Sequence, residues 1–176
     1  MSSTSRILGY VSQPDSRTCQ SACIAKFIGS EDVYSIRADL ENMGVPGDPY
    51  IMGEYLRPRV NEYKFSATAS LNQMSLWLDE GFQLITHGYF SHSGHVVSVV
   101  GKQKNAYIID DPYGEFMASA WIYGQNENGD NMLYSDRLIY ATCVVGISQY
   151  SAMDFYRSAK LIDKAYGNAW IHRIKN

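Results

Sequence analysis

A cysteine and a glutamine near the N-terminus have the spacing of a thiol nucleophile and an oxyanion donor. Gln13 lies six residues before Cys19, which follows a loop containing Pro14 and opens the helix-forming run CQSACIA. A thiol in the first turn of a helix meets the positive end of the helix dipole and unpaired backbone N–H groups, which stabilise the reactive thiolate. The Gln13 amide could donate a hydrogen bond to a developing oxyanion. The alternative is that Cys19 is a small core residue, since free cysteines are often buried.

A histidine at the start of an apolar run supplies the base that such a thiol requires. His95 opens the run in the segment SGHVVSVVG, which predicts a strand over 95–101. The sheet would hold the histidine backbone while its ring faces a cleft, the placement that a general base requires. The alternative is a histidine that begins a strand without any catalytic role.

Two aspartates end the next predicted strand. Asp110 and Asp111 follow an apolar run and precede Pro112. If residues 106–110 pair antiparallel with the His95 strand, the carboxylates at their C-terminal end lie near His95. The proline restricts Asp111 to an extended or turn conformation, so we expect Asp111 to orient the imidazole, with Asp110 as the competing choice. An Asp-Pro pair is also an ordinary turn signal.

The elements that must position these residues are predicted to form one α+β domain over residues 1–176. No linker or repeat divides the chain, and its length suits one domain. With Ser30, Ser70 and Ser151 as N-caps, the apolar patterns predict helices over 19–28, 31–43, 52–60, 71–80 and 152–164. Short β-rich runs predict strands over 82–89, 95–101, 106–110 and 169–174. The apolar run over 136–146 fits either a strand or a buried helix.

The composition narrows the choice of partners. A net charge of −3, with both signs mixed along the chain, offers no basis for nucleic-acid binding. No apolar run has the length of a membrane span, and the first residues lack a signal-peptide core, so we expect synthesis in the cytoplasm and no membrane partner. The three cysteines, Cys19, Cys23 and Cys143, cannot all pair within one chain. The 14 tyrosines and three tryptophans suit either a core or a groove for peptides or sugars.

These motifs, taken together over residues 13–114, resemble the papain-like cysteine peptidases, in particular the group related to bacteriocin double-glycine leader peptidases. The resemblance is carried by the Gln-x5-Cys opening, the helix that follows, the Gly-His-Val-Val strand and the Asp-Pro-Tyr-Gly turn. It implies a papain-like α+β fold in which an N-terminal helical part carries the nucleophile and an antiparallel sheet carries the other groups. It implies Cys19 as nucleophile, His95 as base, Asp111 as its orienting partner and Gln13 as an oxyanion donor, with no cofactor or metal.

One position departs from the family pattern. The family usually has glycine directly after the nucleophile, and this chain has Gln20. The resemblance further implies hydrolysis of peptide or amide bonds. A free-standing unit with a tyrosine-rich C-terminal half is similar to phage and bacterial cell-wall hydrolases, so we expect peptidoglycan as substrate. An endolysin of this kind would reach the cell wall through a partner pore.

Other functions stay open at this stage. A zinc site could draw on His87, His92 and His95 with Asp110 or Asp111. A papain-like fold could also bind a peptide or glycan without cleaving it, act on a protein or leader peptide, or transfer its acyl group to an amine instead of water. Three further residues of reactive type receive no functional role. His172 is expected to be a surface histidine on the last strand, Cys23 is expected to face the core, and Cys143 is expected to lie in an apolar run.

Overall fold

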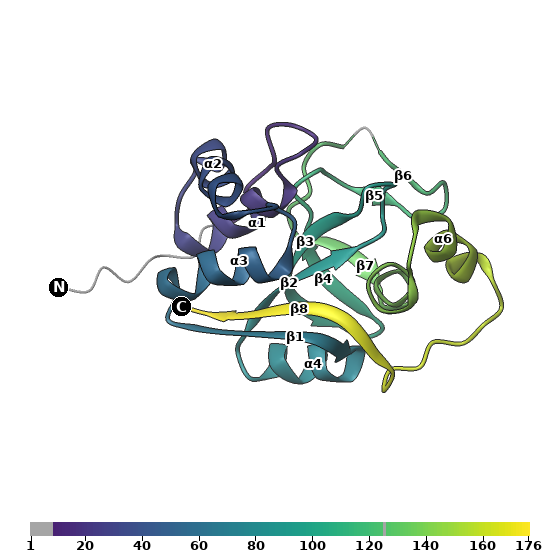
Figure 1. Ribbon diagram of the computed structural model, residues 1–176. Coiled ribbons are helices and arrows are strands. Elements are labelled where there is room, and N and C mark those ends of the chain that lie inside the picture. The colour runs from purple at the N-terminus through teal and green to yellow at the C-terminus, as the bar shows by residue number, and fades with distance from the viewer. Residues whose placement is uncertain (1–8, 125) are drawn as a thin grey trace.

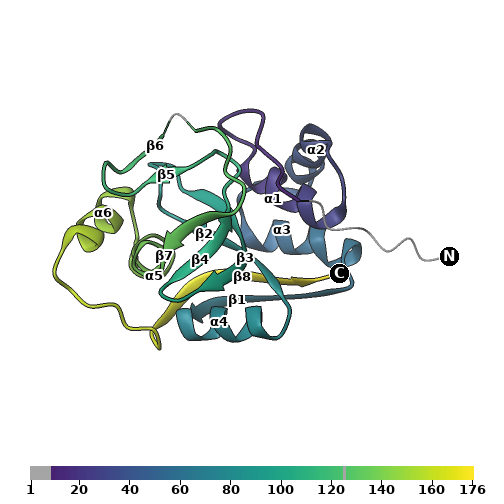
Figure 2. The ribbon, with the colours of Figure 1, turned by 180° about the vertical axis from the view of Figure 1, so that it is seen from behind.

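A six-stranded antiparallel sheet, in the order β1-β8-β2-β3-β4-β7, is the frame of the molecule (Figure 1). The computed structural model describes residues 9–124 and 126–176, so the N-terminal residues considered above for a signal peptide lie outside the described part. Helices α1 to α3 gather at one end of the sheet, α5 and α6 lie at the other end, and α4 lies along β1 and β8 (Figure 1 and Figure 2). This arrangement confirms the predicted α+β class.

The elements have the following bounds. The strands are β1 (Glu62–Ser70), β2 (Gln83–Gly88), β3 (His95–Gln103), β4 (Ala106–Asp110), β5 (Phe116–Met117), β6 (Ile122–Tyr123), β7 (Met132–Ser135) and β8 (Gly167–Lys175). The helices are α1 (Cys19–Ile28), α2 (Val33–Met43), α3 (Pro49–Leu56), the 3-10 turn η1 (Arg57–Arg59), α4 (Leu71–Asp79), α5 (Asp136–Ile139), the π-helical η2 (Tyr140–Val145) and α6 (Gln149–Arg157). Strands β5 and β6 form a separate two-stranded ribbon.

Both faces of the sheet are buried, because successive side chains of its central strands pack into two different hydrophobic cores. Ile85 and Val96 pack with α1, α2 and α3, whereas Leu84, Val97 and Val99 pack with α4 and η2. Side chains alternate along a strand, so two adjacent residues of β3 contact different layers. The start of β3 therefore lies where the helical layer meets the sheet.

The helix that carries Cys19 begins and ends where the sequence predicts. Gly29 ends α1 in the left-handed region, at φ 70°, a conformation that glycine adopts without a steric penalty. The predicted pairing of β3 with β4 is also confirmed, with Ser98 opposite Asp110 in an antiparallel register. The ambiguous run over 136–146 is helical rather than extended.

Three predicted helix boundaries are wrong because a different side chain caps the helix. Asp32, not Ser30, accepts a hydrogen bond from the backbone of α2. Asp48 caps α3 ahead of Pro49, so this helix starts and ends earlier than predicted. Ser148, not Ser151, caps α6.

The last helix also ends at Arg157 rather than Lys164. The reason is Arg137, whose guanidinium donates hydrogen bonds to four backbone carbonyls between residues 155 and 160. These carbonyls at and beyond the end of the helix are satisfied by a side chain, so the chain can leave the helix there.

Strand β1 was not predicted from the sequence. Its run EYKFSATAS is polar and largely half-exposed, because β1 is an edge strand that pairs only with β8. Its partner β8 is correspondingly longer than predicted. Within the described residues, no helix has the length and apolar character needed to cross a lipid bilayer.

Candidate active site

Cys19 occupies the first position of α1, at the end of a loop that is tied to the sheet. The backbone N–H of Gln13 donates to the carbonyl of Pro112 at 2.9 Å, which joins this loop to the turn after β4. Thr18 is the N-cap residue, but its hydroxyl bonds to the carbonyl and carboxylate of Asp15 instead of capping the helix. The first-turn N–H groups therefore stay available beside the Cys19 thiol.

His95 and Asp111 form a buried hydrogen-bonded pair. The distance from His95 Nε2 to Asp111 Oδ1 is 2.7 Å, and the two residues are only 7% and 0% exposed. The antiparallel pairing of β3 and β4 brings the end of one strand to the start of the other, which is why residues sixteen positions apart meet. The structure thus places Asp111 where the sequence predicts the orienting carboxylate.

Two tyrosines complete the surroundings of the Asp111 carboxylate. Oδ2 accepts hydrogen bonds from the hydroxyls of Tyr134 at 2.7 Å and Tyr123 at 3.1 Å, while Oδ1 also accepts from the backbone N–H of Tyr113 at 3.1 Å. With His95, four donors satisfy a carboxylate that water does not reach. Burial and the charge of Asp111 raise the pKa of both phenols, so they remain donors.

The electrostatics of the site favour a charged pair. Burial alone would lower the pKa of His95, but the charge and hydrogen bond of Asp111 raise it to about 10. Burial alone would raise the pKa of Cys19, but the hydrogen bond and charge of His95, with backbone N–H groups of Val96 and Gln20, lower it below the ordinary thiol value. The opposite shifts describe a thiolate beside an imidazolium, the reactive state of a thiol nucleophile.

The competing aspartate has a different partner. Asp110 Oδ2 lies 3.0 Å from the ammonium of Lys26, and its Oδ1 accepts from the backbone N–H of Asn131 at 2.9 Å. Lys26 is a buried residue of α1, so this ion pair fastens the helix that carries the thiol to the end of β4. Asp111, not Asp110, is the carboxylate in contact with His95.

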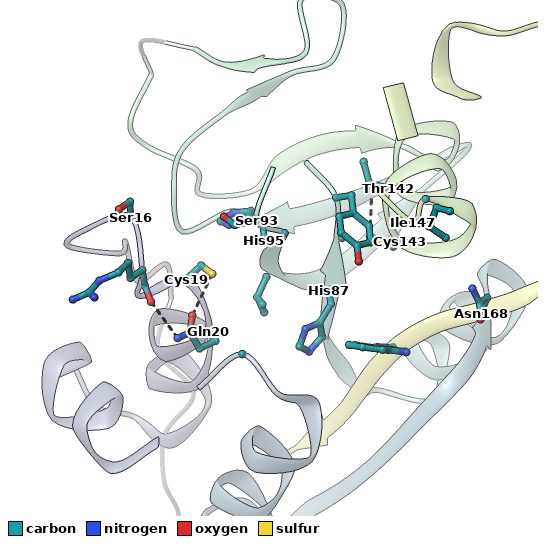
Figure 3. Close-up of a pocket in the computed structure, with 18 of the residues that line it drawn as sticks. Ser16, Cys19, Gln20, His87, Ser93, His95, Thr142, Cys143, Ile147 and Asn168 are labelled. Carbon is teal, nitrogen blue, oxygen red and sulfur yellow. Dashed lines mark hydrogen bonds between the residues drawn. The ribbon is translucent and has the colours of Figure 1, made fainter. Parts of the chain in front are cut away.

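A cavity of about 550 Å³ lies beside the thiol and the imidazole. Cys19 and His95 line one part of it, and His87 and Asn168 line another (Figure 3). Trp170 is also a lining residue. Cys19 is half-buried and lines this cavity, so the nucleophile candidate is reachable by a molecule that enters the cavity.

Comparison with solved structures relates this arrangement to a known fold. A crystal structure of a protein from Bacillus anthracis, assigned as a C39-like peptidase, superposes with a TM-score of 0.52 over 96% of this chain and 95% of that chain, at 10% sequence identity. The chain has a papain-like peptidase fold. No family model matches the sequence, and no curated protein matches it either. The identity is low, so the likeness concerns the fold alone, and the roles of individual residues in this chain rest on its own geometry.

Gln13 is the predicted site residue for which no hydrogen bond to Cys19 or His95 is found among the described residues. Its side-chain amide donates to the backbone carbonyl of Asp15 at 2.6 Å, and Gln13 is not among the residues lining the cavity. Its second amide N–H is the group that an oxyanion role would use. That role stays a prediction.

Gln20, the departure from the family pattern, has defined contacts in this structure. Its amide nitrogen donates to the carbonyl of Arg17 at 3.1 Å, and its amide oxygen lies 3.3 Å from the Cys19 sulfur, which donates to it only while the thiol keeps its proton (Figure 3). A carbonyl only accepts hydrogen bonds, so the nitrogen of Gln20 must face Arg17 and the oxygen must face the thiol. The side chain is 4% exposed and holds the turn that presents Cys19.

The other two cysteines lack the features of a nucleophile. Cys23 is buried one turn along α1, as predicted, and Cys143 is buried in η2. Burial raises the pKa of Cys23 well above its ordinary value and that of Cys143 to about 11. Of the three free thiols, Cys19 alone combines partial exposure with a lowered pKa.

The histidines considered for a metal site lie in three different settings. His95 contacts Asp111, His92 is exposed, and His87 contacts His172. Among residues 9–124 and 126–176 there is no group of three or more His, Cys, Asp or Glu side chains arranged to hold a metal ion. His172 is 0% exposed, so its prediction as a surface histidine is wrong: strand β1, missed in the sequence, covers it.

Proposed function

We propose that this protein is a cysteine peptidase that acts through Cys19, His95 and Asp111. The observation that carries the proposal is the contact of a buried, fully hydrogen-bonded Asp111 with His95, next to a thiol of lowered pKa at a helix N-terminus. A thiolate at that position can attack a carbonyl carbon, and the imidazolium beside it holds the proton that the leaving group needs.

The acylation step uses these groups in order. The Cys19 sulfur donates its electron pair to the carbonyl carbon of the substrate, and the carbonyl oxygen becomes an oxyanion. The backbone N–H of Cys19 stabilises that oxyanion, with the free amide N–H of Gln13 as the second donor in this proposal. When the tetrahedral intermediate collapses, the C–N bond breaks and His95 gives its proton to the leaving amine, so that a thioester on Cys19 remains.

Deacylation returns the site to its starting state. His95, now neutral, takes a proton from water, and the hydroxide attacks the thioester carbon. The C–S bond breaks, the acid product leaves, and Cys19 is again a thiolate beside a protonated His95. Asp111 keeps the imidazole in one orientation through both steps and stabilises its positive charge, as carboxylates do in other triads.

For the substrate we propose the peptide part of bacterial peptidoglycan. The proposal is supported by the tyrosine-rich C-terminal half of the chain and by a cavity with aromatic residues on its wall, among them Trp170. In this proposal the enzyme is an endolysin, made in the cytoplasm and released to the cell wall by a partner pore.

The test uses purified sacculi and mass spectrometry of the released fragments. Wild type and Cys23→Ala should release peptide fragments, whereas Cys19→Ala should lose at least about 1,000-fold of the activity while keeping its far-ultraviolet circular dichroism. Activity retained in Cys19→Ala and lost in Cys23→Ala would overturn the choice of nucleophile.

The other outcomes separate the alternatives. Cleavage of unrelated peptides without release from sacculi rejects peptidoglycan and keeps the peptidase. Transfer of the acyl group to an added amine, in preference to water, identifies an acyl transferase. Binding to sacculi by wild type without any cleavage identifies a binding module.

A further inference from the structure

Three ring side chains outside the proposed triad form a hydrogen-bonded row that starts in the active-site cavity. His87 on β2 and His172 on β8 are joined between their Nε2 atoms at 2.9 Å, and His172 Nδ1 is joined to the Tyr63 hydroxyl on β1 at 2.7 Å. The three strands are neighbours in the sheet. His87 lines the same cavity as Cys19 and His95 (Figure 3), so the row runs from the cavity into the core.

The packing around the row keeps its members in place. Trp170 meets the His87 ring at 5.6 Å between centroids and at 71°, and Phe65 lies 5.0 Å from the His172 ring. A Cβ atom at Gly53 would come within 2.5 Å of the Tyr63 oxygen, which explains why α3 has a glycine where it passes the phenol. The rings cannot turn without displacing these neighbours.

Two neutral arrangements of protons fit the row, and only one of them gives the Tyr63 phenol, which lies against Gly53 of α3, an acceptor and leaves the unpaired N–H on the ring that lines the cavity. Burial lowers the pKa of His87 to about 4 and lowers the pKa of His172 well below its ordinary value, so each ring is neutral and carries one proton. Burial also raises the pKa of Tyr63, which keeps its proton. His172 is the hydrogen-bond partner of Tyr63 within the described residues. The phenol therefore donates to His172 Nδ1, and His172 donates from Nε2 to Nε2 of His87.

This arrangement leaves the proton of His87 on Nδ1. No described residue accepts a hydrogen bond from that atom, and no carboxylate is found among the described residues that line the cavity. His87 thus offers one fixed, uncharged donor to whatever occupies the cavity that the reacting thiol also lines. A hydrogen bond to one ring nitrogen of a histidine, here that of His172 to Nε2 of His87, fixes the tautomer and so decides whether the other nitrogen donates or accepts.

We propose that His87 is a substrate-positioning residue whose Nδ1–H donates to a backbone carbonyl oxygen of the bound peptide. The proposal rests on the peptidase function proposed above and adds the group that aligns the substrate in the cavity. Tyr63 and His172 act through His87, because they hold its tautomer. An extended peptide offers a carbonyl at every residue, and an uncharged donor beside the aromatic wall of Trp170 suits such an acceptor.

The experiment compares two alkylating reagents on Cys19. Iodoacetamide reports the reactivity of the thiol alone, and a mixture of acetyl-tripeptidyl-glycine chloromethyl ketones, with varied residues in the tripeptide, reports binding in the cavity as well. In His87→Leu, the rate with the peptide mixture should fall about tenfold, the effect of one lost hydrogen bond, relative to the rate with iodoacetamide. His87→Asn, which keeps a side-chain N–H donor, should recover most of that loss, and Tyr63→Phe should lose about threefold. His92→Leu, an exposed histidine outside the cavity lining, is the matched control.

The outcomes distinguish this inference from the proposed function. Equal falls with both reagents in His87→Leu, no fall with either, or wild-type protein that reacts no faster with the peptide mixture than with iodoacetamide would each overturn the role of His87. A wild-type Cys19 no more reactive than an ordinary thiol would overturn the peptidase instead. Nitrogen NMR of histidine-labelled protein adds an independent readout: the proton of His87 should be on Nδ1 in wild type, and finding it on Nε2 contradicts the proposal.

Discussion

Two histidines of this sheet make hydrogen bonds of similar length, and one of them is charged while the other is neutral. His95 lies 2.7 Å from Asp111, and His87 lies 2.9 Å from His172. The two sites are close together, because Gly88 and His95 are opposite each other on β2 and β3 and His87 is the residue before that glycine. Yet the pKa of His95 is raised to about 10 and that of His87 is lowered to about 4.

The difference shows that the partner, not the burial, decides the charge of a histidine here. Burial pushes the pKa of both residues down. At His95 the charge of Asp111 outweighs that effect, whereas at His87 the partner His172 is neutral and the charge of Asp48 does not outweigh the burial. One pair therefore supplies a charged acid–base group, and the other supplies a neutral hydrogen-bond donor. The variants below change one pair at a time.

The largest effect is expected from Asp111→Asn, which removes the charge that distinguishes the pairs. His95 should become neutral at pH 7, the Cys19 thiolate should lose its counterion, and peptidase activity should fall by about 1,000-fold or more. The rate of Cys19 alkylation by iodoacetamide at pH 7 should fall by about 100-fold. Both rates are measured on protein whose folding has been checked by circular dichroism.

Asp110→Asn is the control for that change. It breaks the buried ion pair with Lys26, so the free energy of unfolding should drop by about 3 kcal/mol. The alkylation rate of the folded protein should stay near that of wild type. Equal loss of Cys19 reactivity in the two variants would contradict the special role of Asp111.

The second effect is a loss of stability in acid that comes from the neutral pair. His87 has a lowered pKa in the folded state, so between its unfolded pKa near 6.5 and its folded pKa the unfolded chain binds more protons. The free energy of unfolding should therefore decrease as the pH is lowered through this window, and the contribution of His87 to this decrease should be about 3 kcal/mol. Urea unfolding at pH 7 and pH 4 measures it. His87→Asn should lose less stability over the same window than wild type, and identical losses would argue that His87 is not neutral in the fold.

The smallest effect is expected from Tyr134→Phe, which leaves the charge of Asp111 in place and removes one of its four donors. Tyr123 still bonds to the same oxygen, so the unfolding free energy should drop by about 1–2 kcal/mol and the alkylation rate of Cys19 should change by less than about tenfold. Tyr150→Phe, at an exposed tyrosine on α6, serves as the control in urea unfolding. A loss in Tyr134→Phe as large as that in Asp111→Asn would show that the phenol, not the carboxylate charge, governs His95.

The sequence predicts the His95–Asp111 pair better than the His87–His172 pair. The reason is how far apart in the sequence the elements lie that bring each pair together. The start of α1 at Cys19 and the pairing of β3 with β4 follow from local patterns, and these bring His95 and Asp111 together. Tyr123 and Tyr134 lie 12 and 23 residues beyond Asp111, on short strands whose placement no local pattern predicts. Only the tyrosine-rich character of that segment pointed toward them.

The neutral pair depends on a strand with no clear signal of its own. His172 is buried because β1 pairs with β8, and the polar run of β1 resembles a loop in the sequence. An edge strand with one half-exposed face needs few apolar residues. The capping residues Asp32, Asp48 and Ser148 were missed for a related reason, since several neighbouring polar residues could cap each helix and the tertiary contacts select one of them.

The most direct test of this account is a titration of the Cys19 thiolate by its ultraviolet absorbance, taken as the difference between wild type and Cys19→Ala. The account predicts that Cys19 titrates below the ordinary thiol value of about 8.5 and that Asp111→Asn returns its titration toward that value. A wild-type Cys19 that titrates at or above that value, with no change in Asp111→Asn, would contradict the central claim.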